Sequence, residues 1–183
     1  MKIRFAEPAR DAAGCAAIYG PFVRDTAISF EARRPSAQEF ATRIERTSRI
    51  HPWLVAEDDD RLAGFAYGCP HRERAAYRWA AEVSVYVDPA QHRRGVGRGL
   101  YQRLFELLHA QGLYVLCAGI TLPNPASVAL HESLGFVPVG VYRAIGYKLG
   151  RWHDVGWWQL PLRPPAADPP AEPRGPQHAQ TSA

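Results

Sequence analysis

The stretch AEVSVYVDPAQHRRGVGRGLYQRLFELLHAQ, from Ala81 to Gln111, decides the fold of this chain. Polar and apolar residues alternate from Glu82 to Val87, a pattern that predicts a half-buried β-strand. Asp88 and Pro89 end this strand, because proline cannot donate to a strand ladder. Leucines then recur at helical spacing after Gly99, so we expect an amphipathic helix to start there.

A basic, glycine-containing segment separates the expected strand from the expected helix. It reads His92, Arg93, Arg94, Gly95, Val96, Gly97, Arg98, Gly99. Glycines before a helix let the backbone approach a ligand closely, and the unpaired amides of the first turn attract anions. The segment therefore predicts a phosphate-binding turn, with a surface turn before an ordinary core helix as the alternative. It does not fit a dinucleotide fingerprint, because Leu100 stands where the third glycine is required, and it lacks the Walker lysine and hydroxyl.

Length and composition limit the classes of protein to which the chain can belong. A chain of 183 residues fits one domain that can bury a core without disulfides. The net charge of +4 comes mainly from dispersed arginines, so we expect no nucleic-acid partner. Cys15, Cys69 and Cys117 are far apart among apolar neighbours, which predicts reduced thiols and a cytoplasmic location. No apolar run suits a signal peptide or a membrane span, and the histidines lack the paired spacing of zinc sites, so neither a membrane nor a metal is expected.

Two helices are expected before the central stretch. The first enters at Pro8 and is broken by Gly20 and Pro21. The second opens at Ser36, with Glu39 three residues later as a capping box, and runs to about Ser48. Strands are expected at residues 2–5, 53–57 and 62–68, with a turn at residues 58–60.

The segment PHRERAAYRW, residues 70–79, is polar and is interpreted as a solvated loop. Beyond the central helix, which Gly112 ends, the pattern predicts a strand at 114–120, a short helix at 124–134 and a closing hairpin at 135–147 and 154–162. From Arg163 onward prolines are frequent and apolar periodicity is absent, as in disordered tails. We expect one domain at residues 1–162 and a tail at residues 163–183.

Three segments, in this order, resemble the phosphinothricin N-acetyltransferases and the related methionine sulfone and methionine sulfoximine acetyltransferases of the GNAT (Gcn5-related N-acetyltransferase) superfamily. They are WAAEVSVYV (79–87), LPNPASVALHESLGF (122–136) and GRWHDVGWWQL (150–160). The glycine turn is also similar to the pyrophosphate-binding segment of the superfamily, with His92 departing from its first position. The resemblance implies an α/β (α+β) fold with a mixed, mostly antiparallel central sheet flanked by helices. It also implies acetyl-CoA as cosubstrate.

The resemblance assigns the cofactor site residue by residue. The pyrophosphate is expected on His92, Arg93, Arg94, Gly95, Val96, Gly97 and Arg98. The oxyanion site is expected at a backbone amide near Tyr86 or Val87, with Val85 beside them, and Asn124 is expected to contact the pantetheine arm.

His131 stands where most members carry a tyrosine that protonates the thiolate, and phosphinothricin-type enzymes also have histidine there. An imidazolium could protonate a thiolate at neutral pH. The alternative, which the sequence leaves open, is a structural histidine whose hydrogen bonds are satisfied on its helix.

Acetyl transfer to an amine requires that the ammonium group lose a proton. Glu82 is the expected general base, because it starts the polar face of the strand beside Trp79, where partial desolvation favours protonation of a carboxylate. The resemblance implies the same role, through a water molecule. A structural carboxylate paired with an arginine is the alternative.

For the acceptor, the resemblance assigns Arg74 and Tyr77 to a substrate carboxylate and Phe30 to an aromatic wall, and Tyr86 could line the same pocket. Arg74 could equally be ordinary surface charge, and Arg72 and Arg78 are plainer surface candidates. His153 and Asp154 are interpreted as structural residues. Three tryptophans near the closing hairpin favour a homodimer: Trp152, Trp157 and Trp158.

The sequence therefore predicts an acetyl-CoA-dependent N-acetyltransferase that works by direct attack. Its acceptor is expected to be the α-amino group of a small amino-acid-like substrate of the phosphinothricin, methionine sulfone or methionine sulfoximine type. One alternative is acetylation of another amine, such as a polyamine or a protein N-terminus. The other is a non-catalytic acyl-CoA-binding module, which the presence of Glu82 disfavours.

Overall fold

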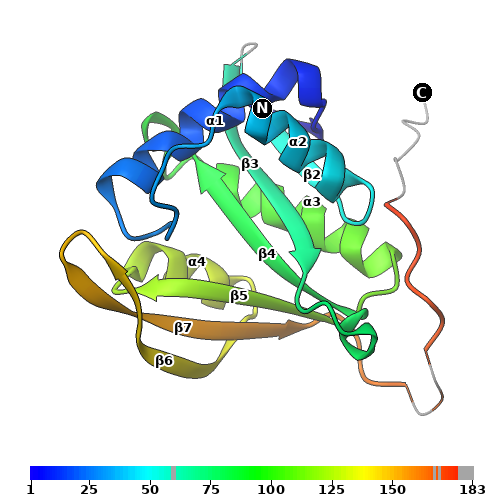
Figure 1. Cartoon of the computed structure of the whole chain (residues 1–183). Helices are drawn as coiled ribbons and strands as arrows, with labels where there is room; N and C mark the ends of the chain where they lie inside the picture. The colour runs from blue at the N-terminus through cyan, green and yellow to red at the C-terminus, as the bar shows by residue number, and fades with distance from the viewer. Residues whose placement is uncertain (59–60, 167, 169, 177–183) are drawn as a thin grey trace.

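The computed structural model describes residues 1–58, 61–166, 168 and 170–176. In this part of the chain a seven-stranded sheet carries four α-helices (Figure 1). The strands are β1 (Lys2–Phe5), β2 (Trp53–Asp58), β3 (Arg61–Pro70), β4 (Ala80–Val87), β5 (Val115–Leu122), β6 (Val137–Lys148) and β7 (Arg151–Pro161). The helices are α1 (Pro8–Asp25), α2 (Ala37–Ser48), α3 (Val96–Ala110) and α4 (Pro125–Ser133), with 3₁₀ turns η1 (Ala75–Tyr77) and η2 (Pro89–Gln91).

The strand order is β1-β2-β3-β4-β5-β7-β6. β4 and β5 pair in parallel, and the other neighbouring strands pair antiparallel. The parallel pair is possible because the crossover through α3 returns the chain to the edge where β4 began. The mixed, mostly antiparallel sheet predicted from the sequence is thereby confirmed.

Helices cover both faces of the sheet. Figure 1 shows α1 and α2 on one side of strands β2 to β4 and α3 on the other. Phe40 of α2 packs edge-on against Trp53 and Phe65 on the first face. Leu104 of α3 belongs to a second buried cluster, on the opposite face, that includes Val83. β4 is thus buried by α3 through its apolar residues, as its alternating pattern predicts.

The first helix continues where the sequence predicts a break. α1 runs through Gly20 and Pro21 to Asp25. Proline inside a helix removes one backbone hydrogen bond, but Ile18 and Val23 on either side are buried in the core and hold the helix together. The expected break at these residues is wrong, because tertiary packing outweighs the local preference.

Other local signals are confirmed by the structure. α2 begins after Ser36, whose hydroxyl accepts from the Glu39 amide while the Glu39 carboxylate accepts from the Ser36 amide. α3 begins at Val96, earlier than the leucine spacing suggests, because Gly95 in the left-handed region, with φ of 79°, turns the chain directly into the helix. The turn predicted at residues 58–60 lies partly outside the described residues.

The hairpin of β6 and β7 closes the sheet. The Asp154 carboxylate accepts from Arg143 at 2.7 Å and from the Ala144 amide at 2.8 Å, where β6 departs from regular register. Nε2 of His153 lies 2.9 Å from the Lys148 carbonyl. Both residues therefore stabilise the hairpin, as expected.

The segment after β7 contacts the domain, although no helix or strand occurs in its described part. The buried Gln111 accepts from the Arg174 amide through its backbone carbonyl, and its Nε2 donates to the Arg174 carbonyl, both at 2.8 Å. The Trp79 indole donates to the Ala171 carbonyl at 2.9 Å. These contacts join Ala171 and Arg174 to the domain, and hydropathy patterns do not reveal such hydrogen bonds of an extended backbone. None of the described helices is long and apolar enough to cross a membrane.

Candidate active site

The ladder between β4 and β5 is short, and the two strands part beyond it. It pairs three residues of each strand: Ala80 with Val115, Ala81 with Leu116 and Glu82 with Cys117. Past Glu82, β4 stays paired with β3 and β5 stays paired with β7. Figure 1 shows the resulting V between β4 and β5. An opening inside a sheet leaves backbone groups of both strand edges available to a ligand.

The opened edge of β4 offers backbone amides. The Asp88 amide donates to the Ala63 carbonyl at 2.9 Å, on the side of β3. Because amides alternate sides along a strand, those of Val85 and Val87 point toward the opening and that of Tyr86 points toward β3. An N–H at such an edge can stabilise a developing oxyanion. Of the two positions suggested by the sequence, strand geometry favours Val87 over Tyr86.

The glycine turn lies at the wide end of the opening. A β-carbon on Gly97 would lie 3.4 Å from Leu130 of α4 and 3.5 Å from Val87 of β4, so this residue lies between the two elements. The first hydrogen bond within α3 joins the Gly99 amide to the Gly95 carbonyl. The amides before Gly99 therefore remain for an anion at the positive end of the helix dipole.

The side chains of the turn add positive charge. Nε2 of His92 lies 3.2 Å from the Val87 carbonyl, and Arg98 donates to the Ser133 hydroxyl at 2.7 Å. Arg94 pairs with Asp58 at 3.2 Å, and Arg93 has φ of 61°. All four basic side chains are exposed, so they can approach a pyrophosphate from solvent.

A cavity of about 60 Å³ lies in the opening. It is lined by β4, β5, α3 and α4, and four residues assigned from the sequence to the cofactor or catalytic site meet there: Val85, Tyr86, Asn124 and His131. Asn124 is the N-cap of α4 and accepts from the Ser127 amide at 3.2 Å. This capping hydrogen bond fixes the Asn124 side chain at the N-terminus of α4.

His131 is held as a neutral ring. Its Nδ1 lies 2.7 Å from the Ser127 carbonyl, which can only accept, so Nδ1 carries a proton. Its Nε2 lies 3.0 Å from the Tyr101 hydroxyl. Burial lowers the pKa of His131, and the Ser127 hydrogen bond offsets this only in part. Burial raises the pKa of the Tyr101 hydroxyl, since burial disfavours the charged form of either group. The imidazolium expected from the sequence is therefore disfavoured, because this buried site does not solvate the charge.

Glu82 lies in a polar cluster. Its Oε1 lies 3.0 Å from Nδ1 of His71 and 3.3 Å from Nη1 of Arg72, and its side chain is 28% exposed. The expected neighbour Trp79 directs its indole N–H to Ala171, so the groups that contact the carboxylate are His71 and Arg72. The arrangement combines a partly buried carboxylate with a histidine and an arginine.

Two cysteines flank Glu82 on the adjacent strands. Cys69 of β3 and Cys117 of β5 lie opposite it in the sheet register. Burial, reinforced by the Glu82 charge, raises the pKa of Cys69 to about 11 and also raises the pKa of Cys117. The thiolate is the nucleophilic form, so neither thiol is prepared to take an acyl group.

The sequence pattern does not single out His71, and it indicates only a surface role for Arg72. The His71 ring lies edge-on to Tyr77 and Trp157, with centroids 5.7 Å and 5.9 Å away. The Arg72 guanidinium lies 5.9 Å from the centre of the Trp157 ring. Both residues line a cavity of about 440 Å³ together with Cys117 and Trp157. A histidine and an arginine directly after the end of β3 were the available signal, but the pattern did not show that they fold back over β4.

The residues assigned to the acceptor do not form one cluster. Tyr77 contacts His71, whereas the exposed Arg74 forms no ion pair with any residue in the described part of the chain. Tyr86 packs edge-on against Tyr19 of α1, with centroids 4.8 Å apart. Phe30 lies against the hairpin, where its ring is 6.2 Å from His153.

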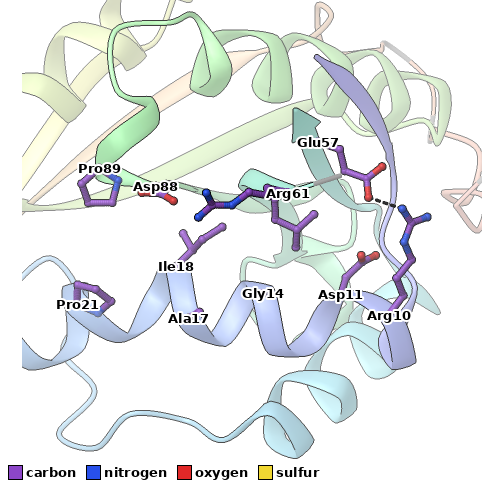
Figure 2. Close-up of a pocket in the computed structure, with 11 residues that line it drawn as sticks. Arg10, Asp11, Gly14, Ala17, Ile18, Pro21, Glu57, Arg61, Asp88 and Pro89 are labelled. Carbon is purple, nitrogen blue, oxygen red and sulfur yellow. Dashed lines mark hydrogen bonds and ion pairs between the residues drawn. The ribbon is translucent and has the colours of Figure 1, made fainter. Parts of the chain in front are cut away.

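A separate cavity of about 450 Å³ lies beside α1 and carries charged residues (Figure 2). Three of its charged residues are paired: Arg10 donates to Glu57 at 2.6 Å, and the buried Asp11 accepts from Arg4 at 2.6 and 2.7 Å. This cluster joins β1, α1 and β2 and is structural. Across residues 1–58, 61–166, 168 and 170–176, no group of three His, Cys, Asp or Glu side chains could hold a metal ion.

The chain is similar to known proteins in both sequence and fold. The family model described as "Acetyltransferase (GNAT) domain" matches residues 3–157. A phosphinothricin N-acetyltransferase of Streptomyces viridochromogenes is 41% identical over 94% of this chain and 94% of its own length. An L-methionine sulfoximine/L-methionine sulfone acetyltransferase of Salmonella typhimurium is 36% identical over 91% of this chain and 98% of its own. A solved phosphinothricin acetyltransferase of Sinorhizobium meliloti, in complex with acetyl-CoA, aligns with a TM-score of 0.87 at 34% identity, covering 93% of each chain.

Proposed function

The chain belongs to the GNAT family of N-acetyltransferases, and on that premise we propose that it transfers an acetyl group from acetyl-CoA to the α-amino group of a small amino-acid-like substrate. The observation that carries this proposal is the opening between β4 and β5, which starts at Glu82 and ends at the glycine turn. It offers a carboxylate at one end and an anion-binding helix terminus at the other.

The cofactor is proposed to lie along this opening. Its pyrophosphate would contact the amides and basic side chains of residues 92–98, and its pantetheine arm would pass Val85, Val87 and Asn124. The Val87 amide would stabilise the oxyanion. Relatives that carry acetyl-CoA in their solved structures align over nearly the whole chain, which supports this placement.

Glu82 is proposed as the general base of a direct attack. A carboxylate that accepts hydrogen bonds from His71 and Arg72 can promote loss of the ammonium proton, which it would receive directly, through water or by way of the His71 imidazole. The raised pKa values of Cys69 and Cys117 disfavour an acetyl-enzyme intermediate. His131 is proposed to contact the thioester end of the cofactor as a neutral ring, hydrogen-bonded to Tyr101.

The acceptor is proposed to be of the phosphinothricin, methionine sulfone or methionine sulfoximine type. Relatives that cover most of this chain carry those names. Arg74 and Tyr77 are proposed to hold the carboxylate of the acceptor, with Phe30 and Tyr86 as apolar walls. Arg72 lines the cavity beside Glu82 and would repel a polyamine, because a polyamine is cationic and binds best in an acidic pocket.

A homodimer through the β6–β7 hairpin is also proposed. Trp152, Tyr147 and Tyr142 on this hairpin are 64%, 62% and 53% exposed, and the rings of Trp152 and Tyr147 lie 5.3 Å apart. Exposed apolar surface of this kind marks interaction sites. Of the three tryptophans suggested by the sequence, Trp158 is buried and Trp157 is partly buried, so the aromatic surface is built from Trp152 and the two tyrosines. The three free cysteines favour a reducing compartment such as the cytoplasm.

Release of free thiol from acetyl-CoA tests the proposed function. Purified protein should release thiol with phosphinothricin, methionine sulfone and methionine sulfoximine, and much more slowly with polyamines and peptides. Thiol release with a polyamine or a peptide alone would establish the rival acceptor. Tight acetyl-CoA binding without thiol release from any amine would establish the non-catalytic module.

A further inference from the structure

His71 and Glu82 form a pair with more chemistry than a lone carboxylate. Nδ1 of His71 lies 3.0 Å from Oε1 of Glu82. An ionised carboxylate only accepts hydrogen bonds, so Nδ1 of the paired ring is the protonated nitrogen. In the neutral tautomer Nε2 then keeps its lone pair and can accept a proton.

The surroundings hold the imidazole in one orientation. Tyr77 and Trp157 each lie edge-on to the ring, and the His71 side chain is only 18% exposed. Arg72 contacts the same carboxylate oxygen and lies over the same tryptophan, which fixes Glu82 as well. A carboxylate that holds an imidazole through Nδ1 sets both its tautomer and its direction, as in catalytic triads.

The pair borders a cavity that reaches the point where β4 and β5 part. His71 lines the cavity of about 440 Å³, as does Cys117, the residue opposite Glu82 where β4 and β5 part. Since Nδ1 is engaged by Glu82, Nε2 is the nitrogen that His71 leaves for a molecule in this cavity. An amine in this cavity would contact the imidazole, which lines it, whereas Glu82 is not among the lining residues.

We propose that His71 and Glu82 act as a carboxylate–imidazole dyad, in which Nε2 of His71 takes the proton that the acceptor's ammonium group loses. The inference rests on the proposed acetyl transfer. The ammonium N–H bond breaks, and the freed electron pair of nitrogen forms the C–N bond with the thioester carbon. The C–S bond breaks and its electron pair leaves with the thiolate, which takes the second proton that the nitrogen gives up. The imidazolium, stabilised by Glu82, returns its proton to solvent.

Charged and titratable groups surround the ring. Glu82 of β4 places a carboxylate beside it, and Arg72 places a guanidinium on the same carboxylate oxygen. Tyr77 of η1 and Trp157 of β7 contact the ring itself. Cys117 of β5 lines the same cavity, and Cys69 of β3 lies opposite Glu82.

The substitution His71→Asn separates positioning of Glu82 from proton transfer. The asparagine side-chain N–H can replace the Nδ1 donor to Glu82, but asparagine has no basic nitrogen. His71→Asn should lower kcat/KM about 100-fold at neutral pH and displace the acid limb of the pH profile, with unchanged acetyl-CoA affinity. His109→Asn is the matched control: His109 is exposed on α3, and this variant should keep wild-type activity.

Two results would overturn the dyad. One is His71→Asn with the wild-type rate and acid limb, which would leave Glu82 as the base alone. The other comes from nitrogen NMR of the imidazole. The dyad predicts the Nδ1-protonated tautomer in the wild-type protein and a titration that moves to lower pH in Glu82→Gln. An identical titration in both proteins would contradict the pair. Absence of thiol release by the wild-type protein with every amine, with the NMR pair intact, would identify a failure of the proposed function itself and end the catalytic role of the dyad.

Discussion

Glu82 of β4 lies opposite Cys117 of β5 at the last paired position of the ladder between these strands. The proposed catalytic carboxylate is therefore at the vertex of the opening in the sheet. The glycine turn follows the far end of the same strand, roughly 16 Å away along β4 at about 3.3 Å per residue. The reacting end and the phosphate end of a cofactor can thus be held by one strand and the helix that follows it.

Substitution of Glu82 tests the catalytic role proposed for the carboxylate at the vertex of the opening. Glu82→Gln keeps the size of the side chain and removes its charge, so turnover should fall about 100-fold or more, most strongly on the acid side of the pH profile. Acetyl-CoA affinity measured by calorimetry should stay the same. A variant with the wild-type pH profile would exclude Glu82 as the base.

Gly97 tests the phosphate end. A β-carbon there meets Leu130 and Val87 at ordinary contact distances, so Gly97→Ala should fold normally. The added methyl stands where the cofactor is proposed to approach the backbone, so the Kd for acetyl-CoA should rise about tenfold, or about 1.4 kcal/mol. Gly175→Ala, with no atom within 4 Å of the added carbon, is the control and should bind as wild type. Unchanged affinity in Gly97→Ala would place the cofactor elsewhere.

Buried histidines should make stability depend on pH. Burial lowers the pKa of both His51 and His131. Each therefore binds a proton more readily in the unfolded chain, so stability is full above the unfolded pKa of about 6.5 and is lost as the pH falls below it. The free energy of unfolding in urea should decline by up to about 1.4 kcal/mol per pH unit for each histidine. His131→Gln should flatten this dependence and the exposed His109→Gln should not; equal slopes in all three proteins would mean that His131 is charged when folded.

The ion cluster beside α1 should contribute to stability. Asp11 is buried and accepts two hydrogen bonds from Arg4, so Asp11→Asn leaves a partly uncompensated guanidinium and should cost about 3 kcal/mol in urea unfolding. Asp25→Asn, which breaks an exposed pair with Arg24, should leave the midpoint unchanged. Similar midpoints for the two variants would show that the buried cluster contributes no more than a surface pair.

The aromatic surface of the hairpin should control assembly. Trp152→Glu adds a charge to the exposed patch, so light scattering should report a monomer for this variant and a dimer for the wild-type protein. Ile50→Glu changes an exposed apolar residue outside the hairpin and should remain dimeric. A dimeric Trp152→Glu protein would assign the interface to another face.

Periodic features of the chain were predictable from the sequence, and long-range contacts were not. Alternation identified β4, and the Ser36–Glu39 capping box located the start of α2, because each signal is local. Pro21 misled the prediction for α1, since burial of the helix face outweighs a lost hydrogen bond.

Within the candidate site, the same distinction holds. Glu82 could be selected because strand alternation places it on a polar face. His71 could not, because its pairing with Glu82 depends on how a polar loop folds back over β4. The neutral state of His131 depends on burial and on Tyr101, which is distant in sequence. The parting of β4 and β5 depends on β3 and β7, which retain the two strands on their outer sides.

Competition between amines tests the central claim most directly. The protein is incubated with acetyl-CoA and an equimolar mixture of methionine sulfone, a polyamine and a short peptide, and the products are identified by mass spectrometry. The predicted result is acetylation of the α-amino group of methionine sulfone, at a rate about 100-fold lower in Glu82→Gln. Acetylation of the polyamine or the peptide in preference to methionine sulfone, or no acetylated product from any amine, would contradict the account.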